Sequence, residues 1–112
     1  MKATILHNPR CSKSRAALAL LEEAGAEVRV IDYLRAPPTP GELARLRDRA
    51  GLDLHDALRP EAKAEVPADA DDATVLAAMA ADPRMIERPL VETAHGVRLC
   101  RPPERVREIL PP

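Results

Sequence analysis

The sequence has almost no aromatic side chains. It contains neither tryptophan nor phenylalanine, and Tyr33 is its only tyrosine. A core must therefore be built mainly from leucine, valine, isoleucine, alanine and methionine. Hydrophobic residues make up 46% of the 112 positions, which is enough for one core without disulfide or metal support. We accordingly expect a single domain over residues 1–112.

Cysteine and long apolar runs are scarce as well. Cys11 and Cys100 are too few for a disulfide framework, which favours a reducing compartment in which thiols stay free. No apolar run approaches the ~18 residues that a membrane-spanning helix requires. Arg10 also interrupts the N-terminal segment before the apolar region of a signal peptide could form. These absences predict a cytoplasmic protein with no membrane partner.

An excess of charge of one sign is missing too. The 17 basic and 18 acidic residues leave a formal net charge of −1, and the two signs are interspersed. Such a surface offers no broad electrostatic field to nucleic acid. No cysteine and histidine have the spacing of metal ligands, and no glycine-rich phosphate loop or nucleic-acid motif occurs. The sequence therefore predicts no metal site and no nucleic-acid partner.

What the sequence does contain is a cysteine at the junction of a strand and a helix. Cys11 follows an apolar run and the turn signal Asn8-Pro9, and an alanine- and leucine-rich helical run begins after it. At such a position the free backbone N–H groups and the helix dipole lower the pKa of a thiol and attract an anion. Several positive or protonatable side chains are close in sequence: His7, Arg10, Lys13 and Arg15. This loop should bind an oxyanion, which suggests thiol chemistry on a small anion.

Ser14 occupies the place that a second cysteine takes in a Cys-x-x-Cys redox pair. The site is therefore monothiol, and an oxidised or adducted sulfur needs an external thiol to resolve it. Two roles remain open for His7, which could assist the thiolate of Cys11 or simply end its strand with a bond to the backbone. Cys100 has an apolar strand context, which favours a packed core residue over a resolving thiol.

The hydrophobic pattern predicts a β-α-β unit at the start of the chain and a β-β-α unit at its end. The N-terminal elements are expected at Lys2–Leu6, Ser14–Ala24 and Val28–Tyr33. The two strands should be parallel because a short helical crossover joins them. The C-terminal elements are expected at Leu90–Thr93, Val97–Cys100 and Glu104–Leu110. The first two of these form a hairpin and should be antiparallel.

Between these units the pattern predicts helices. Thr39-Pro40-Gly41-Glu42 has the form of a capping box, and the helix that it starts should end at Gly51. Leu52–Leu58 is expected to be a shorter helical piece, and Arg59–Asp71 to be a loop. A further helix should begin at Asp71 or Asp72 and end before Pro83.

The order of these elements predicts an α/β fold of the thioredoxin-like type. Such a fold has a four-stranded mixed sheet, here with an all-helical insertion at about residues 39–83. The reactive cysteine begins the first helix, and Pro89 precedes the third strand, where these folds keep a cis proline beside the thiol. Arg88 and Arg101 lie at strand ends, where guanidinium groups can converge on the helix start and bind a tetrahedral oxyanion.

Taken together, these residues resemble the glutaredoxin-coupled arsenate reductase family. The matching segments run in the family's order along nearly the whole chain: His7–Arg15, Tyr33–Pro38 with Glu42-Leu43, Ala57–Arg59, Glu87–Val91 and Arg98–Pro103. The best-known members carry Gly-Thr where this chain has Ser12-Lys13, so the chain resembles a shorter branch with a Cys-Ser-Lys-Ser-Arg loop. After Arg59 the chain has Pro60 and lacks the tyrosine of the family pattern.

The resemblance implies roles for individual residues. Cys11 would be the nucleophile, and His7 would assist formation of its thiolate. The residues implied in oxyanion binding are Arg59, Arg88 and Arg101, together with Ser14 and Arg15 of the Cys11 loop. In the implied mechanism the thiolate attacks arsenate and expels water, glutathione attacks the arsenic adduct, and glutaredoxin completes the reduction to arsenite. No tightly bound cofactor is implied, because glutathione acts as a co-substrate.

Two alternatives to arsenate reduction remain open at this point. One is a glutathione-dependent monothiol oxidoreductase that acts on a mixed disulfide or another oxyanion. The other is a non-enzymatic redox regulator of the same fold that binds RNA polymerase. Such regulators typically use a Cys-x-x-Cys switch, so Ser14 argues against the second alternative. In the preferred interpretation we expect a monomer whose partners are arsenate, glutathione and glutaredoxin.

Overall fold

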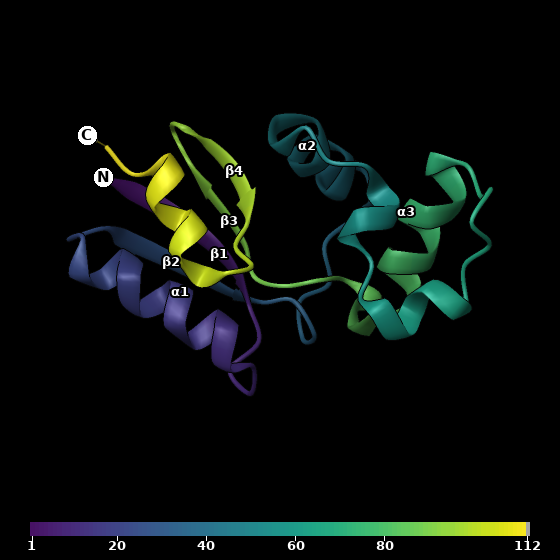
Figure 1. The fold of residues 1–112 in the computed structure, drawn as a ribbon, viewed down its shortest axis with the longest axis horizontal. Helices are drawn as coiled ribbons and strands as arrows, with labels where there is room; N and C mark the ends of the chain where they lie inside the picture. Colours follow the sequence, from purple (N-terminus) through teal and green to yellow (C-terminus); the bar gives the residue numbers. More distant parts are fainter. Residues whose placement is uncertain (112) are drawn as a thin grey trace.

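A four-stranded mixed sheet forms the centre of the structure, a computed structural model that describes residues 1–111 (Figure 1). Its strands are β1 (Lys2–His7), β2 (Glu27–Asp32), β3 (Leu90–Thr93) and β4 (Gly96–Leu99). Their order in the sheet is β2-β1-β3-β4. β1 pairs with β2 in parallel and with β3 antiparallel, and β3 pairs with β4 antiparallel. The predicted thioredoxin-like α/β fold is confirmed.

β1 is a central strand with apolar side chains on both faces of the sheet. Ala3 and Ile5 pack into one layer of the core, and Leu6 packs into the other. A parallel strand that is buried on both sides requires such a continuous apolar run. β1 ends at His7, so the chain leaves the middle of the sheet directly into the loop that carries Cys11.

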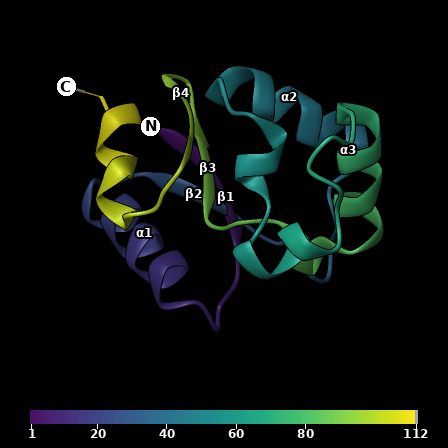
Figure 2. The same ribbon diagram turned by 45° about the vertical axis from the view of Figure 1, so that its right-hand side comes forward.

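Helices cover both faces of the sheet, as the turned view shows (Figure 2). On one face lie α1 (Ser12–Glu23) and the C-terminal 3₁₀ helix η4 (Pro103–Ile109). The other face is covered by the helical segment between β2 and β3, in which α2 (Pro40–Ala50) lies against β4 and α3 (Asp72–Ala81) packs on α2. Tyr33 is buried in this second layer, so the single aromatic ring is part of the core.

The ends of the long helices follow the capping signals of the sequence. The hydroxyl of Thr39 accepts the N–H of Glu42, and Gly51 ends α2 with a left-handed backbone at φ 67°. The carboxylate of Glu42 binds Arg45 instead of the Thr39 N–H, so only half of the predicted capping box forms. α3 is capped by Asp71, whose carboxylate accepts the N–H of Thr74.

Three stretches differ in helix type from the sequence prediction, and α1 begins two residues earlier than predicted, at Ser12. The piece predicted at 52–58 is a 3₁₀ helix, η1 (Leu54–Ala57), and the predicted loop after it contains another, η2 (Pro60–Ala64). Proline at the first position favours a helical turn, and the side chain of Ala62 is buried. This polar segment therefore forms a short helix instead of a loop. The C-terminal helix is also 3₁₀, and its seven residues make it a long run for that helix type. A last short turn, η3 (Pro83–Met85), precedes β3.

Within the helical segment between β2 and β3, residues 57–59 and residues 85–87 are joined by backbone hydrogen bonds. The N–H of Arg59 donates to the carbonyl of Met85 over 2.8 Å, and the N–H of Glu87 donates to the carbonyl of Ala57 over 2.7 Å. This clasp fixes where the chain re-enters the sheet. Within residues 1–111 no helix combines the length and apolar character needed to cross a membrane.

Candidate active site

Cys11 is the N-cap residue of α1, immediately after the loop that leaves β1. Its backbone is extended, with φ −93° and ψ 122°, and its N–H donates to the carbonyl of Asn8 over 3.0 Å. The backbone N–H groups of Lys13 and Ser14 are near enough to favour the ionised sulfur, although the thiol side chain makes no cap hydrogen bond. The first turn of the helix therefore supplies hydrogen-bond donors to a negative charge on Cys11.

These surroundings lower the pKa of Cys11 below that of an ordinary thiol. Partial burial opposes ionisation, but the N–H groups of Ser14 and Lys13 and the positive guanidinium of Arg88 outweigh it. Cys11 is half-buried and so remains open to small reagents. The site thus holds an accessible thiol with increased thiolate character.

His7 and Ser14 form a buried hydrogen-bonded pair that joins the end of β1 to the first turn of α1. His7 Nδ1 lies 2.6 Å from Ser14 Oγ, and that oxygen also accepts the N–H of Asn8 over 3.1 Å. Burial lowers the pKa of His7, an effect that Asp32 opposes and Arg15 reinforces. His7 is therefore neutral near pH 7 and its hydrogen bond goes to Ser14, not to a backbone carbonyl.

Arg88 and Arg101 come together, as their positions at strand ends predict. Arg101 Nη1 donates to the carbonyl of Arg88 over 3.0 Å. The side chain of Arg88 is 14% exposed, and its Nε is buried without a hydrogen-bond partner among residues 1–111. Both arginines precede cis prolines, at Arg88–Pro89 and at Arg101–Pro102, and the first of these cis bonds was predicted from the sequence. The arrangement leaves a buried donor of Arg88 without a partner, on a guanidinium whose charge acts on the thiol.

Arg59 lies at the edge of the site. Its backbone belongs to the clasp with Met85, and its guanidinium Nε is 3.2 Å from a carboxylate oxygen of Glu61. Arg59 also lines a hollow of about 390 Å³ whose other wall is the Cys11 loop, including Asn8 and Arg10. Arg59 therefore faces the Cys11 loop across this hollow. Unlike Arg88, it is not among the groups that lower the pKa of Cys11.

Arg15 has a different environment from the other arginines. Its Nη1 donates to the carbonyl of Pro9 over 3.0 Å, so it braces the Cys11 loop from α1. Its side chain is exposed at this contact. Of the residues implied in oxyanion binding, Arg88 and Arg101 are the ones joined by a direct contact, whereas Arg15 and Ser14 make their contacts within the loop.

Two residues of this region were missed by sequence reasoning. Glu87 is buried, with a carboxylate oxygen 3.2 Å from Nη1 of Arg88 and 3.7 Å from Nη1 of Arg101. Tyr33 is 1% exposed, and burial raises the pKa of its hydroxyl although Arg88, Asn8 and Arg59 act against it. The sequence signals were weak: an acid before Arg-Pro, and the single aromatic residue at a strand end.

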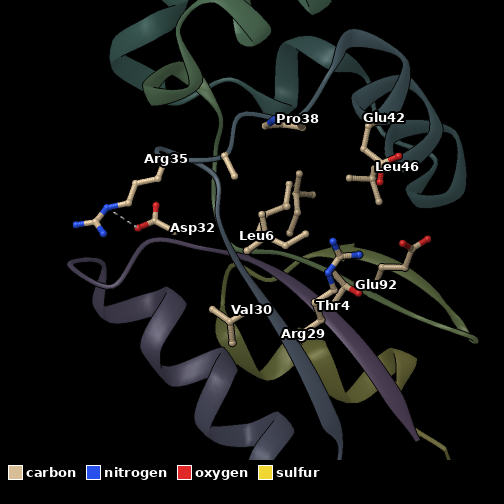
Figure 3. Close-up of a pocket in the computed structure, with 13 residues that line it drawn as sticks. Thr4, Leu6, Arg29, Val30, Asp32, Arg35, Pro38, Glu42, Leu46 and Glu92 are labelled. Atoms are coloured by element: carbon tan, nitrogen blue, oxygen red, sulfur yellow. Dashed lines mark ion pairs between the residues drawn. The ribbon is translucent and has the colours of Figure 1, made fainter.

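A larger hollow than the one beside the Cys11 loop lies elsewhere. It has a volume of about 600 Å³ and opens between the sheet and α2, with Leu6 and Leu46 on its apolar sides (Figure 3). None of the predicted site residues lines it. The ion pair of Arg35 and Asp32, 3.7 Å apart, lines both this hollow and the smaller one beside the Cys11 loop. No group of three or more His, Cys, Asp or Glu side chains within residues 1–111 is arranged to hold a metal ion.

The fold and the site together define a class of protein. A thioredoxin-like sheet with one activated thiol at the start of its first helix, and with serine in the resolving position, is that of a monothiol oxidoreductase. The chain belongs to the ArsC family, whose model matches residues 6–109.

Relatives that are similar over nearly the whole chain support this membership. An arsenate reductase of Rhizobium meliloti (strain 1021) is 42% identical, over 99% of this chain and 83% of the relative. An arsenate reductase of Escherichia coli (strain K12) is 41% identical, over 96% of this chain and 80% of the relative. The solved structure of an arsenate reductase from Vibrio cholerae has a TM-score of 0.92 and 43% identity, covering 98% of each chain.

Proposed function

We propose that this protein reduces arsenate to arsenite through an arsenic adduct on Cys11. The observation that carries the proposal is the Cys11 thiol of lowered pKa beside the Arg88 guanidinium, in a chain of the ArsC family. A thiolate is the reactive form of cysteine, and guanidinium groups suit the charge and shape of a tetrahedral oxyanion. The arsenate reductases named above, which are about 40% identical to this chain, support the choice of substrate.

The first step joins sulfur to arsenic. The Cys11 thiolate attacks the arsenic of arsenate, an S–As bond forms, and one arsenic oxygen leaves as water after protonation. Arsenic stays in its +5 state during this exchange. Arg88 and Arg101 bind the remaining oxygens, because the charge of Arg88 acts on the thiol and Arg101 is hydrogen-bonded to the Arg88 carbonyl.

The following steps use external thiols, because Ser14 cannot close a disulfide with Cys11. A glutathione thiol displaces a second arsenic oxygen as water and forms a second S–As bond. A glutaredoxin thiolate then attacks the glutathione sulfur to give a mixed disulfide, and the electron pair of that S–As bond passes to arsenic, which becomes +3. Hydrolysis of the bond to Cys11 releases arsenite and restores the thiol.

The reaction consumes reduced thiols, so we propose the cytoplasm as its location. We also propose that the protein acts as a monomer, because the proposed steps use only Cys11, Arg88 and Arg101 of a single chain. Elution of the purified protein at the volume expected for 12.2 kDa would support the monomer, and elution at twice that mass would contradict it.

The test is arsenate turnover with glutathione and glutaredoxin. We expect activity in the wild type, none in Cys11→Ser, and a raised KM in Arg88→Ala and Arg101→Ala. Cys100→Ser is the matched control, because Cys100 is the other cysteine of the chain and is fully buried. Turnover of a glutathione mixed disulfide without turnover of arsenate would replace the proposal with a general monothiol oxidoreductase. Tight binding to RNA polymerase with neither activity would indicate a regulator.

A further inference from the structure

A buried carboxylate lies within the proposed oxyanion site. Glu87 directly precedes Arg88, and its side chain is only 11% exposed. A negative charge near a site for anions repels them, and it also loses hydration on burial. The position of Glu87 therefore requires a compensating contribution.

The contacts of Glu87 Oε1 supply that contribution. This one oxygen lies 3.2 Å from Nη1 of Arg88 and 3.3 Å from the backbone N of the same residue. It also lies 3.7 Å from Nη1 of Arg101. A single carboxylate oxygen thus faces donors of both arginines.

The effect on Arg88 is directional. Its Nη1 is held by Glu87, while the same guanidinium acts on the pKa of Cys11 and keeps its Nε buried without a partner among residues 1–111. Arginine is long and flexible, and a fixed contact at one end of the fork aims the remaining donors. The contact with Glu87 therefore orients the free donors of Arg88 to the side where the sulfur lies.

The effect on Arg101 is electrostatic. Two guanidinium groups at neighbouring strand ends repel each other, and Arg101 is further tied to Arg88 by its hydrogen bond to the Arg88 carbonyl. A carboxylate between the two groups reduces that repulsion and lets both stay at the site.

We propose that Glu87 is a positioning residue that holds the guanidinium groups of Arg88 and Arg101 toward Cys11 for a tetrahedral oxyanion. The inference rests on the proposed role of these arginines as oxyanion contacts. Glu87 acts through them and does not touch the reacting atoms. Glutamine keeps the Oε1 acceptor without the charge, whereas alanine removes the acceptor altogether, so the two substitutions separate orientation from charge.

The experiment compares alkylation of Cys11 by iodoacetate, an anion, and by iodoacetamide, its neutral analogue. The ratio of the two rates, divided by the same ratio for free glutathione, measures how well the site attracts an anion and requires no arsenate turnover. Protection of Cys11 by inorganic phosphate gives a second readout. Glu108→Ala is the matched control, since Glu108 likewise pairs with two arginines. These are Arg98 on β4 and Arg105 on η4.

We expect Glu87→Ala to lower the normalised ratio, and the protection by phosphate, on the order of tenfold, as loss of a charge-assisted hydrogen bond implies. Glu87→Gln should keep the wild-type ratio or exceed it, and Glu108→Ala should match the wild type. Thermal melting of each variant checks that it is folded. A Glu87→Ala variant with an undiminished ratio would overturn the inference, and so would an equal loss in both Glu87 variants. A wild-type protein with no anion preference would overturn the oxyanion site itself.

Discussion

Replacing Ser14 by alanine should separate the stability of the Cys11 loop from the reactivity of the thiol. The side chain of Ser14 is fully buried. Its hydroxyl contacts His7 Nδ1 at 2.6 Å and the N–H of Asn8 at 3.1 Å, and alanine leaves both groups without that partner. The backbone N–H of Ser14, which is one of the groups that lower the pKa of Cys11, is retained in the variant.

The size of the effect follows from these two contacts. A net hydrogen bond contributes about 1 kcal/mol, and a buried group left without a partner costs about 1–3 kcal/mol. His7 is 7% exposed and must bear most of that cost, whereas Asn8 is half-buried and can bind water instead. We therefore expect the free energy of unfolding to fall by about 2 kcal/mol. The pKa of Cys11 should remain below that of an ordinary thiol.

Urea unfolding at constant pH measures the first quantity. The midpoint should fall by about 1 M with an unchanged slope, given a slope of roughly 2 kcal/mol per molar for a domain of this size. The pH dependence of Cys11 alkylation measures the second. Ser12→Ala is the matched control, because Ser12 is exposed in the same turn. Loss of less than about 0.5 kcal/mol, the range of surface substitutions, would refute the reasoning from the buried contacts. A Cys11 pKa that rises to the ordinary value would refute the separation of roles.

Three further predictions concern titration and accessibility. Arg88→Met should raise the pKa of Cys11, because it removes a positive charge and a donor near the sulfur; pH-dependent alkylation by iodoacetamide measures this, and an unchanged profile would contradict it. Cys100 should resist alkylation in the native protein and react after unfolding, because burial raises its pKa to about 12; mass spectrometry of the labelled protein checks the site of reaction. Burial holds the pKa of His7 below 6.5, the ordinary value for histidine, so the unfolded chain binds more protons between the folded pKa and 6.5. This group should make stability fall as pH drops through that window and leave it flat above, and His7→Gln should reduce the slope of urea midpoint against pH.

Much of the fold could be predicted from local sequence signals. Thr39 and Gly51 mark the ends of α2 because a cap and a left-handed glycine depend on a few neighbouring residues. Cys11 could be identified for the same reason, since the strand-to-helix junction is visible in a short stretch of sequence. The cis bond before Pro89 follows from its place ahead of the third strand.

The parts that could not be predicted depend on contacts between distant segments. Tyr33 reaches the site because the end of β2 lies beside the Cys11 loop, and nothing in its neighbours along the chain shows this. The role of Glu87 depends on its contact with Arg101, and pairing of β3 with β4 brings these two residues together. The 3₁₀ form of η4 is likewise a matter of competition between hydrogen-bond patterns that hydrophobic spacing does not resolve.

The clasp between residues 57–59 and 85–87 has a consequence for how sequences of this fold can diverge. The chain between its two sides, from η2 through η3, leaves and returns at points joined by backbone hydrogen bonds of 2.8 and 2.7 Å. Added or deleted residues in such an excursion change its length without moving its ends, and longer loops cost little extra closure entropy. Relatives should therefore tolerate insertions between residues 60 and 84, while Arg59, which is part of the clasp, and Arg88, which directly follows it, keep their places relative to the thiol.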